Sequence, residues 1–355
     1  MGKICIVGAS NIKHISLISL YTKYLDEHNI PYDIIYLDRY GVQEQTTAQN
    51  QFCFRANMRV GKIKKLLTFW KFRRFAISKL KSENYDLVIT WQATTAYLLC
   101  GFLKRRYCGK FVMNIRDYII ENNPLVRSLL KRQLKQTAMV TISSEGFLEF
   151  LPEADYVRVN SINEELLADV VPVNPEAVEP YKIGFVGNCR FFSESYKLID
   201  ALANDPRFEL WYCGTNSDVL KAYAQEKNIT NVRTIPGFDQ KDTLSIMSGF
   251  HMVNSAFGND ALDNRTLMPI RLYTALAMHL PMLVNEGTQL AKEVTKGQVG
   301  FVIGDYANMK ESLYDYLKNL DRKQLAEYCD LYLQHARQEN QVFYEKLAQL
   351  IGAGK

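Results

Sequence analysis

Short apolar segments alternate with helical patterns along the whole chain, and this alternation restricts the possible folds more than any other feature. In the first half these segments cover residues 3–7, 32–37, 86–91, 110–115 and 138–142. A helical pattern follows the first of them from about His14 to His28. Such an order predicts a parallel sheet with helices on both of its faces.

The second half repeats the alternation, which predicts a second domain of the same class. Its candidate strands cover residues 182–186, 208–213, 232–235, 250–254 and 282–284. Residues 170–180 contain three prolines and are typical of a linker. We therefore expect an α/β fold of two doubly wound domains, over residues 1–175 and 176–335. A final helix over 336–355 would pack back on the first domain.

Composition indicates a soluble globular protein, with 47% hydrophobic and 23% charged residues. No apolar run reaches the roughly 18–20 residues that cross a bilayer, and the first residues lack the features of a signal peptide. The seven cysteines are scattered without a C-x-x-C pair, which favours reduced thiols in a cytoplasmic protein. We expect no obligatory metal and no other cofactor.

Basic residues are concentrated in the first half. Residues 1–179 contain 24 Lys and Arg against 18 Asp and Glu, while the remainder contains 19 against 20. Residues 59–81 carry nine Lys and Arg, no acid and several aromatic side chains, and smaller basic clusters follow at 104–106 and 127–135. The segment 59–81 fits either a helix at an anionic membrane surface or a solvated helix whose aromatic side chains enter the core. The charge also allows nucleic acid, but no known nucleic-acid motif accompanies it.

Two turns of the first half directly follow candidate strands. Because ligands bind at the carboxyl ends of the strands in such sheets, we select Gly8, Ser10, Asn11, Arg116 and Asp117 as candidate site residues. The structural alternatives are a glycine that serves only the turn and a local ion pair between Arg116 and Asp117. The first turn is not the G-x-G-x-x-G of dinucleotide binding, which argues against a nicotinamide enzyme.

The stretch 267–285 (LMPIRLYTALAMHLPMLVN) is the most informative part of the second half. A proline opens a short helical pattern, and Arg271 lies in its first turn beside backbone N–H groups without intrahelical partners. A helix N-terminus attracts anions, and phosphate in particular. The pattern predicts either a diphosphate clamp around Arg271 or an ordinary amphipathic helix before a core strand.

With these features in place, the chain resembles the nucleotide-sugar glycosyltransferases of the GT-B architecture, which have two Rossmann-like domains and a final helix. The second half is similar to the family 4-type enzymes of bacterial capsule and exopolysaccharide gene clusters. The matching segments are 182–190 (KIGFVGNCR), 197–202 (KLIDAL), 209–214 (ELWYCG), 231–238 (NVRTIPGF) and 268–288 (MPIRLYTALAMHLPMLVNEGT). The last segment is similar to the P-N-K-L-Y-E-x-x-x-x-x-x-P-[IV] pattern of that family, and the first half matches mainly in architecture.

The resemblance implies roles for individual residues of the second half. Arg190 and Arg271 would stabilise the departing diphosphate of the donor, and Lys197 would add a third cation. The other implied donor-binding residues are Gly187, Asn188, Tyr212, Gly214, Gly237, Phe238, Pro269, Tyr273, Thr274, Gly287 and Thr288.

The chain departs from the family pattern at two of its positions. Thr274 stands where a glutamate usually holds the donor ribose, and Ile270 stands where asparagine is usual. A hydroxyl makes a hydrogen bond to ribose but no charge-assisted pair, so another group holds the ribose or the site is weakened.

The resemblance implies a metal-independent, retaining glycosyltransferase that moves a sugar from a UDP- or GDP-sugar to a saccharide on a polyprenyl-diphosphate lipid. The basic segment 59–81 fits such a lipid-linked acceptor, and with it a cytoplasmic, peripheral protein at the inner face of the cell membrane that acts in surface polysaccharide synthesis. Asp117 is the candidate for orienting or deprotonating the acceptor. The alternatives are a nucleotide-sugar 2-epimerase of the same architecture and a catalytically silent partner of another glycosyltransferase. An epimerase needs acid–base groups, and His251, His279 and His335 lie in contexts better interpreted as structural.

Overall fold

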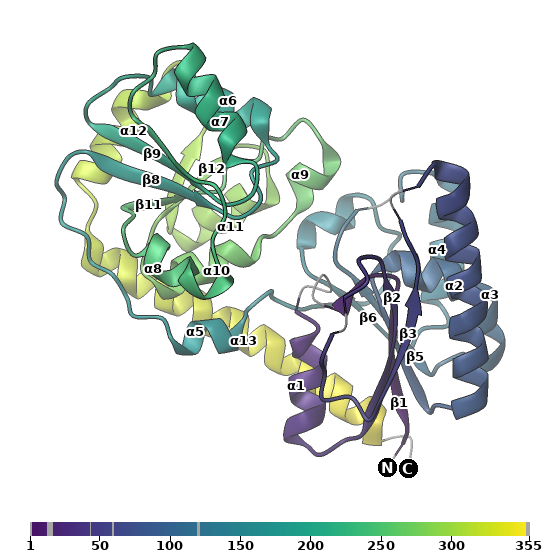
Figure 1. Cartoon of the computed structure of the whole chain (residues 1–355). Helices are drawn as coiled ribbons and strands as arrows, with labels where there is room; N and C mark the ends of the chain where they lie inside the picture. Colours follow the sequence, from purple (N-terminus) through teal and green to yellow (C-terminus); the bar gives the residue numbers. More distant parts are fainter. Residues whose placement is uncertain (1, 13–16, 43, 59, 119–120, 353–355) are drawn as a thin grey trace. The chain divides into compact units, whose positions relative to one another are not determined.

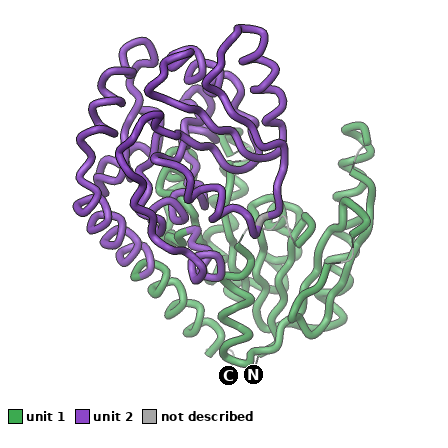
Figure 2. Tube along the Cα trace, turned by 60° about the vertical axis from the view of Figure 1, so that its left-hand side comes forward, with its two compact units in different colours: residues 1–160, 338–355 green, residues 161–337 purple. Residues whose placement is uncertain are grey.

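The computed structural model describes residues 2–12, 17–42, 44–58, 60–118 and 121–352, so the predicted helix starts at His14 and Arg59 lie outside it. The chain divides into two compact units, shown in Figure 1 and coloured separately in Figure 2. Unit 1 comprises Met1–Asn160 and Gln338–Lys355, and unit 2 comprises Ser161–Arg337. Each unit contains a parallel sheet with helices, which confirms the predicted α/β fold.

The sheet of unit 1 has seven strands in the order β3-β2-β1-β4-β5-β6-β7. Their bounds are β1 (Ile4–Gly8), β2 (Tyr32–Asp38), β3 (Asn50–Arg55), β4 (Leu87–Trp91), β5 (Phe111–Ile115), β6 (Met139–Ile142) and β7 (Tyr156–Arg158). β1, β2, β4, β5 and β6 match the predicted strands. The edge strands β3 and β7 do not have the expected pattern, because β3 is largely exposed and β7 is only three residues long.

Helices cover both faces of the unit 1 sheet (Figure 1). They are α1 (Ser19–Glu27), α2 (Lys62–Glu83), α3 (Ala93–Arg106) and α4 (Pro124–Leu134), with a 3-10 turn η2 (Glu145–Glu149). α2, α3 and α4 form one layer, and α1 lies on the other side of the sheet. α2 packs through Phe72, Ala76 and Leu80, which are buried.

The sheet of unit 2 has six strands in the order β10-β9-β8-β11-β12-β13. Their bounds are β8 (Tyr181–Val186), β9 (Phe208–Cys213), β10 (Val232–Ile235), β11 (Met252–Asn254), β12 (Met282–Asn285) and β13 (Gly300–Ile303). The chain runs from β8 outward to β9 and β10 and then crosses to β11 on the other side of β8. This reversal creates a topological switch point between β8 and β11, where sheets of this type bind their ligands.

The helices of unit 2 are mostly short. They are α5 (Glu164–Ala168), α6 (Phe192–Ala201), α7 (Ser217–Glu226), η3 (Gln240–Asp242), α8 (Thr243–Met247), α9 (Leu262–Thr266), α10 (Ile270–Ala277), α11 (Gln289–Gly297) and α12 (Met309–Lys318). In the part of the chain that the structure describes, no helix combines the length and apolar character needed to cross a membrane.

The division between the units falls after Asn160, whereas the proline-rich stretch led us to expect it after residue 175. Ile162 and Leu167 explain the difference, because both side chains are buried in the core of unit 2. The prolines that follow are also tied to unit 2. The backbone N–H of Val173 donates to the carbonyl of Met278 over 3.0 Å.

The long helix α13 (Arg322–Gly352) belongs to both units. Its first part, through Arg337, buries Leu325, Cys329 and Leu333 in the core of unit 2. From Gln338 onward it belongs to unit 1, where the ring of Phe343 packs edge-on against Tyr21 at 5.1 Å between centroids. The expected return of the last helix to the first domain is therefore observed, although the helix begins well before residue 336.

Candidate functional site

Three adjacent strands of unit 2 are each followed within two residues by a glycine with a backbone conformation that other residues rarely adopt. Gly187 follows β8 with φ +129°, Gly214 follows β9 with φ +131°, and Gly237 follows β10 with φ +111°. A Cβ atom on Gly214 would lie only 2.0 Å from the carbonyl oxygen of Gly187. The sequence thus allows the turns to pack backbone against backbone, which leaves their outer surface open to a ligand.

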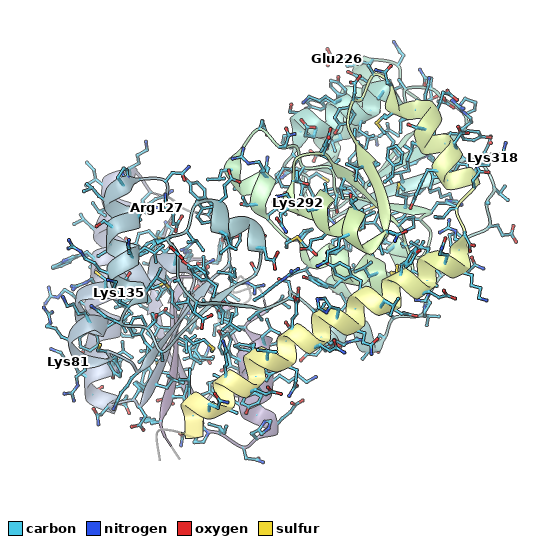
Figure 3. All side chains as sticks on the ribbon, turned by 180° about the vertical axis from the view of Figure 1, so that it is seen from behind. Lys81, Arg127, Lys135, Glu226, Lys292 and Lys318 are labelled. Carbon is cyan, nitrogen blue, oxygen red and sulfur yellow. The ribbon has the colours of Figure 1, made fainter. Side chains whose placement is uncertain are left out.

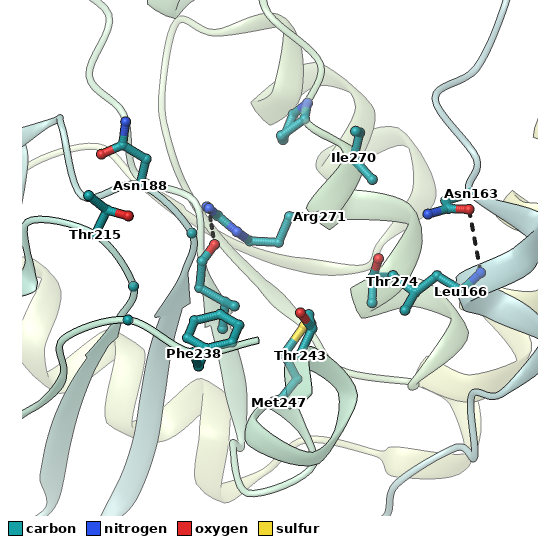
Figure 4. A pocket seen from close by; sticks show the side chains of 15 residues that line it. Asn163, Leu166, Asn188, Thr215, Phe238, Thr243, Met247, Ile270, Arg271 and Thr274 are labelled. Carbon is teal, nitrogen blue, oxygen red and sulfur yellow. Dashed lines mark hydrogen bonds between the residues drawn. The ribbon is translucent and has the colours of Figure 1, made fainter. Parts of the chain in front are cut away.

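A cavity of about 500 Å³ lies over these turns within unit 2 (Figure 4). It is lined by Asn163, Leu166, Val186, Gly187, Asn188, Gly214, Thr215, Gly237, Phe238, Thr243, Met247, Pro269, Ile270, Arg271 and Thr274. The lining combines apolar side chains, such as Phe238 and Met247, with backbone and polar groups around the glycine turns. Arg271 is the only charged side chain among these described lining residues.

Arg271 binds the ends of the two strands that flank the switch point. Its guanidinium donates to the carbonyl of Val186 at the end of β8, as the dashed line in Figure 4 marks. The same group donates to the carbonyl of Asn254 at the end of β11 over 3.3 Å and to Oγ of Ser255 over 3.4 Å. These bonds hold the cation at the carboxyl edge of the sheet.

The surroundings of Arg271 remove its charge from water without supplying an anion. The guanidinium lies over the ring of Phe185 at 4.0 Å and near that of Phe257 at 5.6 Å. Loss of hydration lowers the pKa of Arg271 to about 10, so the group is still protonated at neutral pH. No Asp or Glu in the described part of the chain forms an ion pair with it. A cation that loses part of its hydration is costly unless it is paired, and an anionic ligand would supply the missing partner.

The start of α10 adds to this positive potential. Pro269 is the N-cap residue and has no N–H, and no side chain caps the first turn. The free N–H groups of that turn and the helix dipole favour an anion near the same place as Arg271. Proline and arginine, two residues apart, therefore place a helix end and a cation together, as the sequence predicted.

The structure brings many of the predicted donor-binding residues together around this cavity. They are Gly187, Asn188, Gly214, Gly237, Phe238, Pro269, Arg271 and Thr274. These residues come from four different turns of the chain, and the carboxyl edge of the sheet unites them.

The two other predicted cations do not line the cavity. Arg190 is exposed, and its guanidinium lies over the ring of its neighbour Phe191 at 4.9 Å. Lys197 forms an ion pair of 2.5 Å with Glu194, one turn earlier in α6. This carboxylate partner was not predicted, because the resemblance covered the lysine and not the glutamate.

The remaining predicted donor residues make contacts within unit 2 away from the lining. Tyr212 is buried and donates through its hydroxyl to the carbonyl of Ser195 over 3.4 Å. Tyr273 is buried on α10, and Gly287 lies in the turn after β12. Thr288 caps α11, since its Oγ accepts from the N–H of Ala291 over 3.0 Å.

Sequence reasoning missed the lining residues from α5 and α8. Asn163 and Leu166 lie before the expected domain start, and Thr243 and Met247 lie in a helix without any recognised motif. Only the folded chain brings these short helices to the cavity. Thr215 directly follows the predicted residue Gly214, so the glycine pattern could have identified it.

The candidate residues of unit 1 lie at the carboxyl edge of its own sheet. Asn11 is buried and donates to Asp38 over 2.9 Å and to Glu44 over 3.2 Å. Burial opposes ionisation of Asp38, but hydrogen bonds from Asn11, the backbone N–H of Tyr40 and Arg55 outweigh it and hold the pKa of this carboxyl well below its usual range. Asn11 therefore connects the turns that follow β1 and β2.

The other candidates of unit 1 differ in exposure. Gly8 is the last residue of β1, and Ser10 is buried in the turn that follows. Arg116, directly after β5, is buried, and its carbonyl accepts from the hydroxyl of Ser143 over 3.4 Å. Asp117 is exposed. Among the residues that the structure describes, no group of three or more His, Cys, Asp and Glu side chains could hold a metal ion.

Comparison with known proteins places the fold but gives no family. No protein-family model matches the sequence, and no curated protein matches it either. Solved structures match over almost the whole chain. The two-sheet architecture is that of the GT-B class, whose structures include several glycosyltransferases.

Three of these structures illustrate the similarity. Sucrose-phosphate synthase from Thermosynechococcus elongatus is 13% identical, with a TM-score of 0.76 over 99% of this chain and 100% of that chain. HepE from Anabaena, solved in complex with UDP and glucose, is 14% identical, with a TM-score of 0.69 over 98% of this chain and 100% of that one. The lipopolysaccharide outer core galactosyltransferase WaaB is 13% identical, with a TM-score of 0.66 over 99% and 100% of the two chains.

Proposed function

We propose that the protein is a glycosyltransferase and that unit 2 holds its nucleotide-diphosphate sugar donor. The observation that carries this proposal is Arg271, a partly buried cation at the switch point of the unit 2 sheet that pairs with no carboxylate in the described part of the chain. Glycine turns, a helix N-terminus and an apolar wall around Phe238 complete a site suited to a diphosphate joined to a base. That HepE binds UDP on a similar fold agrees with this proposal.

The proposed reaction breaks the bond between the anomeric carbon of the sugar and the β-phosphate oxygen. A new bond forms from that carbon to an acceptor hydroxyl oxygen, and the hydroxyl proton passes to the departing diphosphate oxygen or to the carboxylate of Asp117. Negative charge grows on the departing diphosphate, and Arg271 with the α10 N-terminus would stabilise it without a metal. A fixed donor of this kind typically contributes 10²–10³ in rate, or about 2.7–4 kcal/mol. We further propose retention of anomeric configuration, as the resemblance implies.

The base and ribose of the donor would contact uncharged side chains. Phe238 and Met247 offer apolar surface, and Thr274 and Asn163 offer hydrogen-bonding groups. Thr274 stands at the position of the usual glutamate, so a neutral hydrogen bond would replace a charge-assisted one at the ribose.

We propose that unit 1 is the acceptor side and that the acceptor is a saccharide on a polyprenyl-diphosphate lipid. Gly8, Ser10, Asn11, Arg116 and Asp117 lie where such a sheet presents ligand-binding turns. Exposed Asp117 would orient the acceptor hydroxyl or take its proton. This assignment fits a peripheral enzyme at the inner face of the membrane in capsule or exopolysaccharide synthesis.

Nucleotide binding and nucleotide release test the proposal. Calorimetry with UDP, GDP and their sugars should give binding to one nucleotide class, and release of the nucleoside diphosphate should need a lipid-linked acceptor. Release without acceptor, leaving a 2-epimerised sugar, would instead identify an epimerase. A chain that binds none of these nucleotides would be a silent partner, and the proposal would be wrong.

A further inference from the structure

The helix layer α2, α3 and α4 of unit 1 has an extreme charge bias. Lys and Arg number eight on α2, three on α3 and three on α4, against the single acid Glu83 at the end of α2. The helices pack side by side, and Nε of Arg73 on α2 donates to the carbonyl of Leu98 on α3 over 2.8 Å. Clusters that are separate in the sequence thus become one basic surface, on which Figure 3 labels Lys81, Arg127 and Lys135.

The first half of α2 also exposes a line of large apolar side chains. Ile63, Leu66, Leu67 and Trp70 are 78%, 71%, 53% and 50% exposed. They follow the spacing i, i+3, i+4 and i+7, so they occupy one stripe on the helix, which we call the α2 stripe. The buried residue Phe72 and those one and two turns after it lie on the opposite side, against the core. The second half of the helix therefore packs on the core, and the first half leaves its apolar side chains exposed.

A second exposed apolar group lies on α4. Leu125 is 81% exposed and Leu129 is 37% exposed, four residues later on the same side of the helix. α2 follows the edge strand β3 and α4 follows β5, so the first turns of both helices lie toward the carboxyl edge of the sheet. The exposed apolar side chains of both helices therefore lie toward that end of the basic layer.

We propose that the outer surface of this layer binds an anionic membrane, with the α2 stripe and Leu125 entering the interface. Basic side chains around the stripe would contact lipid phosphates, each worth about 1 kcal/mol, or roughly fivefold in binding. Trp70, whose ring lies 4.9 Å from the guanidinium of Arg74, is a residue type favoured at membrane interfaces. This inference rests on the peripheral membrane role in the proposed function and names the surface of unit 1 that would contact the membrane.

The exposed aliphatic side chains favour a membrane over a nucleic acid as the partner. A basic surface alone fits either, because both present phosphates. Leu66 and Ile63 would gain nothing beside a phosphodiester backbone, whereas the acyl boundary of a bilayer accepts them. Basic side chains with apolar ones between them are the pattern of helices that lie in the interface.

Vesicle sedimentation with the full chain tests this surface separately from nucleotide binding. We expect binding to vesicles that contain phosphatidylglycerol and little binding to phosphatidylcholine alone. Two variants should each bind the anionic vesicles at least about tenfold less: Lys62, Lys64, Lys65 and Lys71→Gln, and Ile63, Leu66 and Trp70→Ser. Because all these side chains are exposed, nucleotide binding and the unfolding temperature should not change.

A matched control removes the same charge elsewhere. Replacing the exposed Lys221, Lys292, Lys296 and Lys323 of unit 2 by glutamine should leave vesicle binding unchanged. Equal losses in this control and in the α2 variant would show a general charge effect and overturn the inference. Full vesicle binding by both α2 variants would overturn it as well.

Tryptophan fluorescence tests whether the α2 stripe enters the interface. Trp91 is buried, and the half-buried Trp211 lies in unit 2, where it donates to Glu209 over 2.7 Å. A shift of emission to shorter wavelength on vesicle binding should therefore come mainly from exposed Trp70. The Trp70→Phe variant should bind vesicles but lose the shift. Vesicle binding by the wild type without any shift, or tighter binding to duplex DNA than to vesicles, would contradict the inference.

Discussion

Arg271 is the residue on which the proposed chemistry depends. Its guanidinium is fixed by backbone carbonyls and two aromatic rings, so little reorganisation is needed when charge develops beside it. A cation kept in place in this way can stabilise a leaving group more effectively than a mobile surface lysine.

Arg271→Ala should lower kcat/KM at least tenfold, and by up to about 10²–10³, while the fold is retained. Steady-state kinetics with the preferred nucleotide sugar would measure this. Arg190→Ala is the matched control, because Arg190 is exposed and does not line the cavity, and its effect should be below about threefold. Unchanged kinetics for Arg271→Ala would remove the residue from the site.

The glycine turns permit a second comparison between single residues. Gly214→Ala should destabilise unit 2 by more than Gly237→Ala, although both glycines have a positive φ. The φ alone costs about 1–3 kcal/mol for alanine, and at Gly214 the new Cβ would also meet the carbonyl of Gly187. Around Gly237, apart from its two chain neighbours, no heavy atom of the described residues lies within 4 Å of such a Cβ. Urea denaturation would measure both, and equal losses would contradict the proposed close approach.

At the scale of elements, the start of α11 is stabilised by Thr288, a residue that was predicted to contact the donor and that caps this helix in the structure. Thr288→Ala should cost about 0.5–2 kcal/mol of stability, because the cap to the N–H of Ala291 is lost. Thr288→Ser keeps the hydroxyl and should recover most of it. Nucleotide affinity, measured by calorimetry, should be the same for both. A loss of nucleotide affinity in Thr288→Ala but not in Thr288→Ser would show that this hydroxyl contacts the donor.

His251 fastens the segment before β8 to the start of β11. Its Nδ1 accepts from the backbone N–H of Lys182 over 2.9 Å, so Nε2 carries the proton and donates to the carbonyl of Glu176 over 3.0 Å. Burial lowers the pKa of His251, and the positive charges of Arg322 and Lys182 lower it further. The ring is therefore neutral in the folded protein.

Stability should fall on acidification, because the unfolded state binds the His251 proton first. The contribution is complete above the unfolded pKa of about 6.5 and is lost as pH falls toward the lower folded value. Calorimetric unfolding between about pH 7.5 and pH 5.5 should show a flatter pH dependence for His251→Gln than for the wild type. Parallel curves would mean that another group controls this range.

The sequence predicts elements where burial leaves a continuous apolar run and fails where it does not. β1 (ICIVG) and β4 (LVITW) are such runs and are buried throughout, whereas the edge strand β3 (NQFCFR) is largely exposed and half polar. The site follows the same logic. A glycine after a strand, or Pro269 before Arg271, is a local sequence signal from which a site residue can be predicted. Asn163 and Met247 reach the cavity only through tertiary contacts, which the sequence does not reveal. Arg190 shows that residue type alone does not determine where a side chain points.

At the scale of the whole molecule, each unit has its own core and α13 contributes to both. Phe343→Ala should destabilise unit 1 by about 3–5 kcal/mol, because the ring is fully buried against Tyr21. Hydrogen exchange should show the loss in unit 1 alone, and nucleotide affinity should be unchanged. An equal loss of protection throughout unit 2 would contradict separate cores.

The discontinuity of unit 1 has a consequence for biosynthesis. Residues 338–352 are translated after all of unit 2, yet they supply Asn340, which exchanges hydrogen bonds with Asn160 over 2.7 and 3.1 Å. Domains generally fold as they leave the ribosome. Unit 1 therefore begins to emerge first but is completed last. Until residues 338–352 have been made, its sheet lacks the apolar cover that α13 provides.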